Sequence, residues 1–303
     1  MTTTTPPPPL VSVIVTCFNQ ARLITETLQS VARQTFQGFE CIVVDDGSLD
    51  ESASVIRAFV ERDARFRLIS QPNQGVAATR NTGFQQARGQ LIQFLDGDDL
   101  LDPEKLQLQV QYLEEHPELN AVLCLHRFLD HRSGTFSRHR FEPVQQRPLR
   151  QLLEGWHAGV SIPVHSPLFR RSIWGPDELP YPVNYRGRCE DWVFLIQVAL
   201  KRTEFGSIDR ELCTYRVGCS NFTENVENAC GAAIEAAMFI SSLLPVEMRT
   251  EFIHGVCQRT LRRYVELKKS QILADSVSWR IGRVITGPVV ALLRLASGLR
   301  RVR

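Results

Sequence analysis

Several features that would assign this chain to other protein classes are missing from its sequence. It has no stretch of 18 or more uninterrupted apolar residues, so we expect no membrane-spanning helix. None of its eight cysteines forms a CxxC pair, and we expect the reduced, mostly buried thiols of a cytosolic protein. No GxGxxG motif follows an early apolar run, which disfavours a dehydrogenase.

A large excess of one charge sign is missing as well. The chain has 35 Lys and Arg residues against 33 Asp and Glu residues, and its net charge of +2 gives no reason to expect nucleic-acid binding. Residues 2–9 are only threonine and proline, without the apolar segment of a secretory signal. We therefore expect a disordered lead-in over residues 1–9 and a cytoplasmic protein.

Short apolar runs and helical periods alternate through the first 125 residues. This alternation predicts an α/β fold with a mostly parallel, doubly wound (Rossmann-like) sheet and flanking helices. The predicted strands lie at residues 10–15, 41–44, 66–69, 91–95 and 121–125. Later in the chain we expect a helix over residues 191–201, strands over 164–170, 205–208 and 212–217, and helices from about residue 226 onward.

Polar or acidic side chains follow three of the predicted strands. They are Thr16–Asn19, Asp45–Ser48 and Asp96–Asp99. Ligands of such sheets bind at the carboxyl ends of the strands, where these segments should meet. Clustered carboxylates repel one another unless a cation lies between them, and Mg²⁺ or Mn²⁺ is the usual partner of oxygen ligands. The pattern predicts a site for a metal ion and a diphosphate.

Four segments resemble, in order and spacing, the motifs of family 2 glycosyltransferases. They are Val11–Asn19, Val43–Ser48, Asn73–Gly83 and Phe94–Asp99, and the resemblance extends from residue 10 to about 217. It implies a fold of the GT-A type. The nucleotide-sugar-binding half would lie at residues 10–125 and the acceptor-binding half at 126–220, followed by a helical C-terminal extension at 221–303.

The resemblance assigns donor-binding roles near the first two strands. Asp46 matches the aspartate that hydrogen-bonds the nucleotide base, and Thr16 and Phe18 match residues that line the base pocket. Asn19 beside them is included among the donor-binding residues. The alternative for Asp46 is a turn between strand and helix in which an aspartate caps the helix.

The run from Asp96 to Asp99 resembles the DxD element of the family. The resemblance implies that Asp98 coordinates the metal ion and that Asp96 lies toward the ribose or behind the metal, with Asp99 in support. Arg80, in the helix after Gly75, has two open interpretations. It can bind a donor phosphate, or it can brace the Asp96 turn through hydrogen bonds.

Glu190 and Asp191 resemble the acidic pair that contains the catalytic base of the family. An inverting transfer needs one carboxylate to accept the proton of the attacking hydroxyl, and we assign Asp191 to this role with Glu190 in support. The alternative is an ordinary acidic first turn of a helix. His165 lies in a segment that resembles one beside the acceptor pocket, and either an acceptor contact or a structural role suits it.

Two parts of the sequence depart from or exceed the family pattern. Gly218 stands where the family often has a histidine, so no role is assigned there. The tail at residues 276–303 carries six arginines, no acidic residue and interleaved apolar residues. Such a segment can adsorb to the inner face of a membrane as a peripheral contact, or it can pack on the catalytic domain as a helix with an exposed basic end.

The sequence thus predicts an inverting, Mn²⁺- or Mg²⁺-dependent glycosyltransferase. The expected donor is a UDP-sugar, the expected acceptor a glycan or lipid-linked molecule, and the expected pathway surface polysaccharide biosynthesis. One alternative is a sugar-nucleotide-binding protein without catalysis. Another is a sugar nucleotidyltransferase, although residues 16–21 lack the glycine and lysine that would hold a triphosphate.

Overall fold

The structure is a computed structural model that describes residues 8–137, 146–155, 162–185, 187–218 and 226–274. The lead-in at residues 1–7 and the basic tail at 276–303 lie outside these residues. The chain divides into two compact units, which are described separately here. The first comprises Met1–Pro148, Ile162–Arg186 and Val198–Cys219, and the second comprises Leu149–Ser161, Gly187–Gln197 and Ser220–Arg303.

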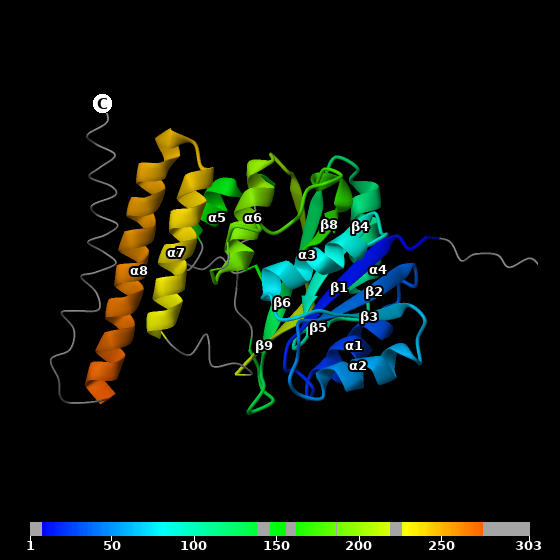
Figure 1. Ribbon diagram of the computed structural model, residues 1–303. Helices are drawn as coiled ribbons and strands as arrows, with labels where there is room; N and C mark the ends of the chain where they lie inside the picture. Colours follow the sequence, from blue (N-terminus) through cyan, green and yellow to red (C-terminus); the bar gives the residue numbers. More distant parts are fainter. Residues whose placement is uncertain (1–7, 138–145, 156–161, 186, 219–225, 275–303) are drawn as a thin grey trace, which may run out of the picture. The chain divides into compact units, whose positions relative to one another are not determined.

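Nine strands form one sheet in the described part of the first unit. Their order is β3-β2-β1-β4-β8-β6-β9-β5, with β7 paired to the outer end of β6. The four strands from β3 to β4 run parallel and lie side by side (Figure 1), which confirms the expected mostly parallel arrangement. The strands are β1 Val11–Cys17, β2 Phe39–Asp45, β3 Phe66–Ser70, β4 Leu91–Asp96, β5 Leu100–Leu101, β6 Ala121–Asp130, β7 Phe136–Ser137, β8 Leu168–Arg170 and β9 Phe205–Val217.

Helices cover both faces of the parallel strands. Alternate side chains of a strand point to opposite faces, so Val11, Val13 and Val15 of β1 share one face and pack with apolar residues of three helices. These helices are α1 Ile24–Ala32, α2 Ser52–Val60 and α4 Lys105–Glu115. On the opposite face, α3 (Val76–Gln86) lies against Ile14 of β1 and Val44 of β2. Because both faces are covered, β1 and β2 are buried throughout.

Three strands differ from the sequence-based expectation. β6 continues five residues beyond Leu125, because β7 and β9 pair with its outer half. The two predicted strands at residues 205–208 and 212–217 form one strand, β9, in which irregular pairing with β6 absorbs the polar residues between them. β8 is shorter than predicted and begins after Pro167, which has no N–H to donate to a neighbouring strand.

The second unit is helical in its described part. It contains α5 (Leu149–Gly155), α7 (Val226–Leu243), α8 (Val246–Ala274) and the first turns of α6 (Glu190–Leu200). α7 and α8 lie side by side (Figure 1). Trp192 of α6 is buried, donates from Nε1 to the Leu152 carbonyl at 3.0 Å and packs against Phe252 of α8 with ring centroids 5.8 Å apart. The helices predicted from residue 226 onward are thus confirmed as far as Ala274.

Two expectations from composition can be compared with the described residues. No helix among them is long and apolar enough to cross a bilayer. Six of the cysteines are described as free thiols, and four of these are buried, as expected. The buried ones are Cys17, Cys41, Cys124 and Cys213.

Candidate functional site

The carboxyl ends of three parallel strands bring the predicted polar segments together. In the sheet register Thr16 of β1 is the partner of Asp96 of β4, and Cys17 is the partner of Asp45 of β2. Thr16, Asp46 and Asp96 therefore lie at one edge of the sheet, and the turn from Gly97 to Asp99 follows directly. This carboxyl edge is the candidate site.

Asp96 is held by two neighbours. Its Oδ1 accepts hydrogen bonds from Thr16 Oγ1 at 2.9 Å and from Arg80 Nη2 at 2.8 Å. Burial alone would raise the pKa of Asp96, but the Arg80 guanidinium outweighs it and holds this pKa below its usual value. The Arg80 side chain is only 1% exposed. Of its two interpretations, the structure shows the brace on Asp96.

The turn after Asp96 needs a glycine because three elements crowd it. A Cβ at Gly97 would lie 2.3 Å from Gln20 Oε1 and 2.6 Å from the Thr16 carbonyl oxygen. The Thr27 hydroxyl of α1 donates to the Gly97 carbonyl at 2.8 Å, and the Asp99 N–H donates to the Asp96 carbonyl at 3.1 Å. The backbone on either side of Asp98 is therefore fixed by β1, by α1 and by the turn itself.

Asp98 differs from its two acidic neighbours in what it contacts. Its carboxylate has no salt bridge and no hydrogen-bond donor from another residue in the described part of the chain. Burial, followed by the negative charges of Asp99 and Asp96, raises the pKa of Asp98 to about 7. The surroundings of Asp98 therefore favour a cation beside its carboxylate, and no side chain of the described residues supplies one.

Asp99 is buried, with an ion-pair contact at one oxygen and a hydrogen bond at the other. His165 Nδ1 lies 3.0 Å from Oδ2, and the Arg216 N–H donates to Oδ1 at 2.7 Å. Burial would lower the pKa of His165, but the Asp99 carboxylate beside it outweighs burial and holds this pKa above its usual value. Burial in turn raises the pKa of Asp99. His165, for which an acceptor contact was one expectation, is fully buried against the acidic turn.

The donor set around Asp98 fits a divalent cation of the Mg²⁺ or Mn²⁺ type. These ions take oxygen ligands and commonly bind through one or two carboxylates plus phosphate oxygens and water. Among the described residues no group of three or more His, Cys, Asp or Glu side chains converges to hold a metal. Since Arg80 and His165 already neutralise the flanking carboxylates, an ion at Asp98 would need phosphate and water to complete its coordination.

Asp46 has a structural task that its predicted role did not include. Its carboxylate accepts hydrogen bonds from Gln71 Nε2 at 2.7 Å, from the Gln74 N–H at 2.9 Å and from the Gly75 N–H at 2.9 Å. The side chain is buried and shapes the loop that leads into α3. The predicted helix cap is absent here, because α2 begins later, at Ser52, and the Asp46 side chain bonds this other loop.

Phe18 and Asn19 lie on the loop that follows β1. The Phe18 ring is 44% exposed, as a surface that receives a flat ligand would require. Asn19 has a left-handed backbone with φ of 53° and joins two loops: its N–H donates to Ser48 Oγ at 2.9 Å, and its Oδ1 accepts from the Leu49 N–H at 2.7 Å. Asn19 thus joins the loop after β1, which carries Phe18, to the loop after β2.

Glu190 and Asp191 form the first turn of α6, in the second unit. The predicted residues that the first unit brings together are Thr16, Asp46, Arg80, Asp96, Asp98, Asp99 and His165.

Some residues that hold the site were not singled out from the sequence. Thr27 and Arg216 reach the acidic turn from 70 and 117 residues away, and Gln71 reaches Asp46 from the end of β3. The segment from Tyr215 to Ser220, which contains Arg216 and Gly218, resembles a late motif of the family, and this resemblance was the available signal. The Arg216 side chain also pairs with Glu26 of α1 at 2.9 Å, so this residue links β9 both to the acidic turn and to α1.

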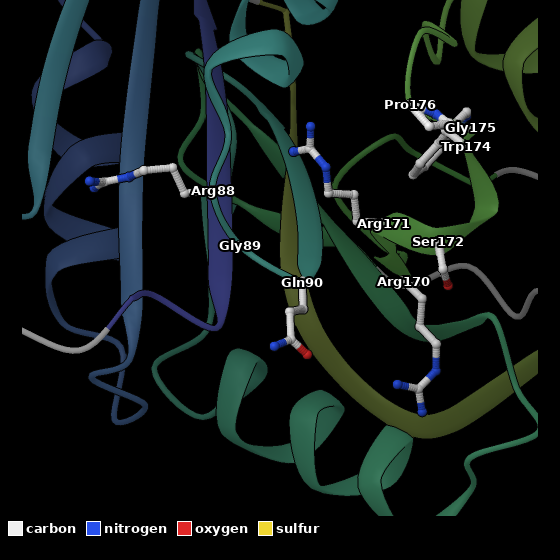
Figure 2. A pocket seen from close by; sticks show the side chains of 9 residues that line it. All are labelled: Arg88, Gly89, Gln90, Arg170, Arg171, Ser172, Trp174, Gly175 and Pro176. Carbon is white, nitrogen blue, oxygen red and sulfur yellow. The ribbon is translucent and has the colours of Figure 1, made fainter.

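A pocket of about 470 Å³ lies at the opposite, amino edge of β4, beside the end of β8. Figure 2 shows its three arginines, Arg88, Arg170 and Arg171, extending away from one another. Arg88 Nε donates to the Glu40 carboxylate at 3.0 Å, Arg170 Nη2 to the Leu113 carbonyl at 2.6 Å and Arg171 Nη1 to the Ala87 carbonyl at 2.7 Å. Each guanidinium therefore serves an acceptor of the fold.

Comparison with known proteins identifies the family of the chain. The sequence model of the family described as "Glycosyl transferase family 2" matches residues 12–175. An uncharacterized glycosyltransferase of Rickettsia felis is 30% identical over 290 residues, which cover 91% of this chain and 45% of that protein. The chain spans 33%, 45% and 63% of the lengths of three such curated relatives.

Solved structures confirm the fold. S. aureus TarS 1–349 in complex with UDP-GlcNAc has a TM-score of 0.67 at 18% identity, over 95% of this chain and 81% of that one. The mannosyltransferase PcManGT from Pyrobaculum calidifontis, in complex with GDP-Man and Mn²⁺, has a TM-score of 0.61 at 18% identity, over 98% and 81%. The expected GT-A-type fold is therefore correct.

Proposed function

The chain belongs to glycosyl transferase family 2, and from this we propose that it moves a sugar from a nucleoside diphosphate sugar to an acceptor hydroxyl with inversion at the anomeric carbon. The observation that carries the proposal is Asp98, a carboxylate flanked by two others that already have cationic partners. The complexes of structural neighbours with UDP-GlcNAc and GDP-Man support a nucleotide-sugar donor. A UDP-sugar is our first choice.

Asp98 would hold Mn²⁺ or Mg²⁺, and the bound ion would supply positive charge that offsets the charge on the departing diphosphate. Asp96 stays ionised beside it because Arg80 lowers its pKa. Asp96 can therefore accept a hydrogen bond from a ribose hydroxyl through its second oxygen. Arg80 would thus act on the donor indirectly, by holding Asp96 in place and ionised.

The loops after β1 and β2 would receive the nucleotide base. Phe18 offers an exposed aromatic face for stacking, and Thr16 lies two residues before it near the end of β1. Asp46 orders the loop from Gln71 to Gly75, and Asn19 orders the loop around Phe18. These residues would shape the base pocket before the donor arrives.

Asp191 would act as the catalytic base, with Glu190 beside it in support. The acceptor oxygen attacks the anomeric carbon, the bond from that carbon to the diphosphate oxygen breaks, and the hydroxyl proton passes to Asp191. A carboxylate in the first turn of a helix is a weak base because the helix dipole favours its charge. Proton transfer should therefore come late, when the new C–O bond is already forming.

The acceptor that we propose is a glycan or a lipid-linked molecule in surface polysaccharide assembly. A cytoplasmic enzyme would meet a lipid-linked acceptor at the inner face of a membrane, and the basic tail at residues 276–303 suits a peripheral contact there. Ending the chain after Asp275 should shift the protein from the membrane fraction to the supernatant. Equal partitioning of both forms would refute the membrane contact.

Release of UDP from a panel of UDP-sugars, measured with Mn²⁺ and with EDTA, tests the function. We expect turnover only with the metal, and its loss in Asp98→Asn and Asp191→Asn. A binding protein without catalysis would bind UDP-sugar and release no UDP. A nucleotidyltransferase would instead form pyrophosphate from a nucleoside triphosphate and a sugar phosphate.

A further inference from the structure

A set of buried polar side chains lies behind the acidic turn, and the proposed function does not use it. It begins at Asp99, whose two carboxylate oxygens are taken up by His165 Nδ1 at 3.0 Å and by the Arg216 N–H at 2.7 Å. Asp99 is 2% exposed and His165 is 0% exposed. Asp99 therefore cannot turn without breaking a contact at one of its oxygens, and Asp98 is its neighbour in the chain.

His165 is itself fixed from behind. Gln93 Nε2 of β4 donates to the His165 carbonyl at 3.1 Å, and Lys105 Nζ of α4 donates to Gln93 Oε1 at 2.5 Å. Lys105 also donates to Gln109 Oε1, and Gln109 Nε2 donates to the carbonyl of the next residue, Ser166, at 3.0 Å. Helix α4 and strand β4 thus hold the backbone that carries the His165 ring.

Such a network is costly for stability alone. Lys105, Gln93 and Gln109 are fully buried, and apolar side chains of similar volume would fill this space without the desolvation of an ammonium group. Two of its members, however, bond adjacent carbonyls of one short segment, those of His165 and Ser166, and so fix the backbone that places the His165 ring 3.0 Å from Asp99 Oδ2. On the other side of the His165 ring, Tyr215 stacks nearly parallel, at 13° and 6.1 Å between centroids. The ring is therefore confined.

We infer that His165 is a positioning residue for metal binding at Asp98: together with Asp99 it fixes the turn that presents the Asp98 carboxylate. The inference rests on the proposed function and deepens it, since it assigns His165 to the metal side of the site and not to the acceptor. Residues that orient a metal ligand commonly contribute 10- to 100-fold to metal affinity or activity.

Titration calorimetry of Mn²⁺ into the full chain with saturating UDP tests this inference. His165→Ala should weaken Mn²⁺ binding by roughly 10- to 100-fold. His165→Asn should keep most of the affinity, because the Asn amide nitrogen can lie beside Asp99 Oδ2 where Nδ1 lies now. UDP binding in EDTA should be the same in all variants, because the base pocket is untouched.

Glu40→Gln is the matched control. Glu40 is a buried carboxylate of the same sheet, bonded by Ser12 and Arg88 at the opposite edge, and its replacement removes a buried negative charge without touching the turn. It should lower the melting temperature and leave the Mn²⁺ affinity unchanged. Asp99→Asn removes the carboxylate of the Asp99–His165 pair and keeps the side-chain volume, so it should weaken Mn²⁺ binding. This variant tests the positioning role if His165→Ala does not fold.

The outcomes separate the two proposals. Wild-type affinity for Mn²⁺ in folded His165→Ala or Asp99→Asn, or an equal loss in Glu40→Gln, would overturn the positioning role alone. A wild-type protein whose UDP affinity is the same in Mn²⁺ as in EDTA would overturn the metal-dependent function, and the positioning role with it.

Discussion

The two edges of the sheet in the first unit handle charge in opposite ways. At the amino edge Glu40 is bonded by Ser12 and Arg88, and Arg170 and Arg171 bond main-chain carbonyls in α4 and just after α3. Each of these charged side chains has a partner within the fold. In the acidic turn at the carboxyl edge, Arg80 and His165 pair with two of the three carboxylates, Asp96 and Asp99.

This difference in charge pairing is a better guide to the candidate site than the presence of a cavity. The amino edge has the pocket and a gathering of arginines, but the guanidinium groups diverge (Figure 2) and are occupied by the protein itself. The carboxyl edge has one carboxylate, Asp98, whose surroundings raise its pKa to about 7. A fold tolerates such a residue when a ligand supplies the missing charge.

The largest effect should come from removing the carboxylate that has no partner. We expect Asp98→Asn to reduce turnover with Mn²⁺ by on the order of 10³-fold, because positive charge would no longer be held at the leaving diphosphate. The rate of UDP release measures this effect. Glu40→Gln at the other edge should retain nearly full activity, and comparable losses in both variants would erase the distinction between the edges.

Replacing one arginine at each edge compares the ion pairs that the two arginines make with a carboxylate. Arg80→Met should destabilise the protein by about 3 kcal/mol, because it leaves Asp96 charged and without its cation. Arg88→Met should cost about 1 kcal/mol or less, because the Arg88 side chain is 67% exposed and its pair with Glu40 is partly screened. Urea denaturation measures both values, and a larger loss for Arg88→Met would contradict the comparison.

Each edge also has a glycine in close contact with β1. A Cβ at Gly89 would lie 2.5 Å from the Ser12 amide nitrogen, and one at Gly97 would lie 2.3 Å from Gln20 Oε1. Replacing either glycine with alanine should destabilise the protein by about 1–3 kcal/mol. Only Gly97→Ala should also raise the Mn²⁺ concentration needed for half-maximal turnover. A metal effect from Gly89→Ala would show that general loosening of the sheet suffices.

The last prediction concerns pH in the absence of metal. The pKa of Asp98 is raised from 3.8 to about 7 in the folded protein, so the folded state holds this proton more tightly than the unfolded chain. The stabilising contribution is fully present below about pH 4 and is lost as the pH rises through about 7. In EDTA, the melting temperature of the wild type relative to Asp98→Asn should therefore fall over this range. A constant difference would mean that Asp98 titrates normally.

The parallel strands and the acidic edge were predictable because their signals are local. Each of the strands β1, β2 and β4 is one apolar run followed directly by its polar end, and the parallel register then places Thr16 beside Asp96. The side chains that hold the site were not predictable in this way. Thr27 bonds Gly97 across 70 residues, and Arg216 bonds Asp99 across 117. Such contacts depend on how the elements pack and leave no period in the sequence.

Asp46 shows a second limit of reading residues one by one. An aspartate after a strand can cap the next helix, bind a ligand or hold a loop, and all three uses need the same residue type at the same place. The structure shows the loop contacts, through the N–H groups of Gln74 and Gly75. Asp46 holds a loop because β3 brings the loop from Gln71 to Gly75 beside its carboxylate, and this placement is not visible in the residues around Asp46.

The interleaved path of the chain has a consequence for how the protein is made. Leu152 of α5 and Trp192 of α6 leave the ribosome well before Phe252 and Arg259 of α8, against which this part of the chain packs. Their buried surfaces must wait for α8 to be synthesised. A fragment cut after residue 219 would display the Trp192 ring permanently, so trimming the C-terminal helices should yield an aggregating product and not a smaller enzyme.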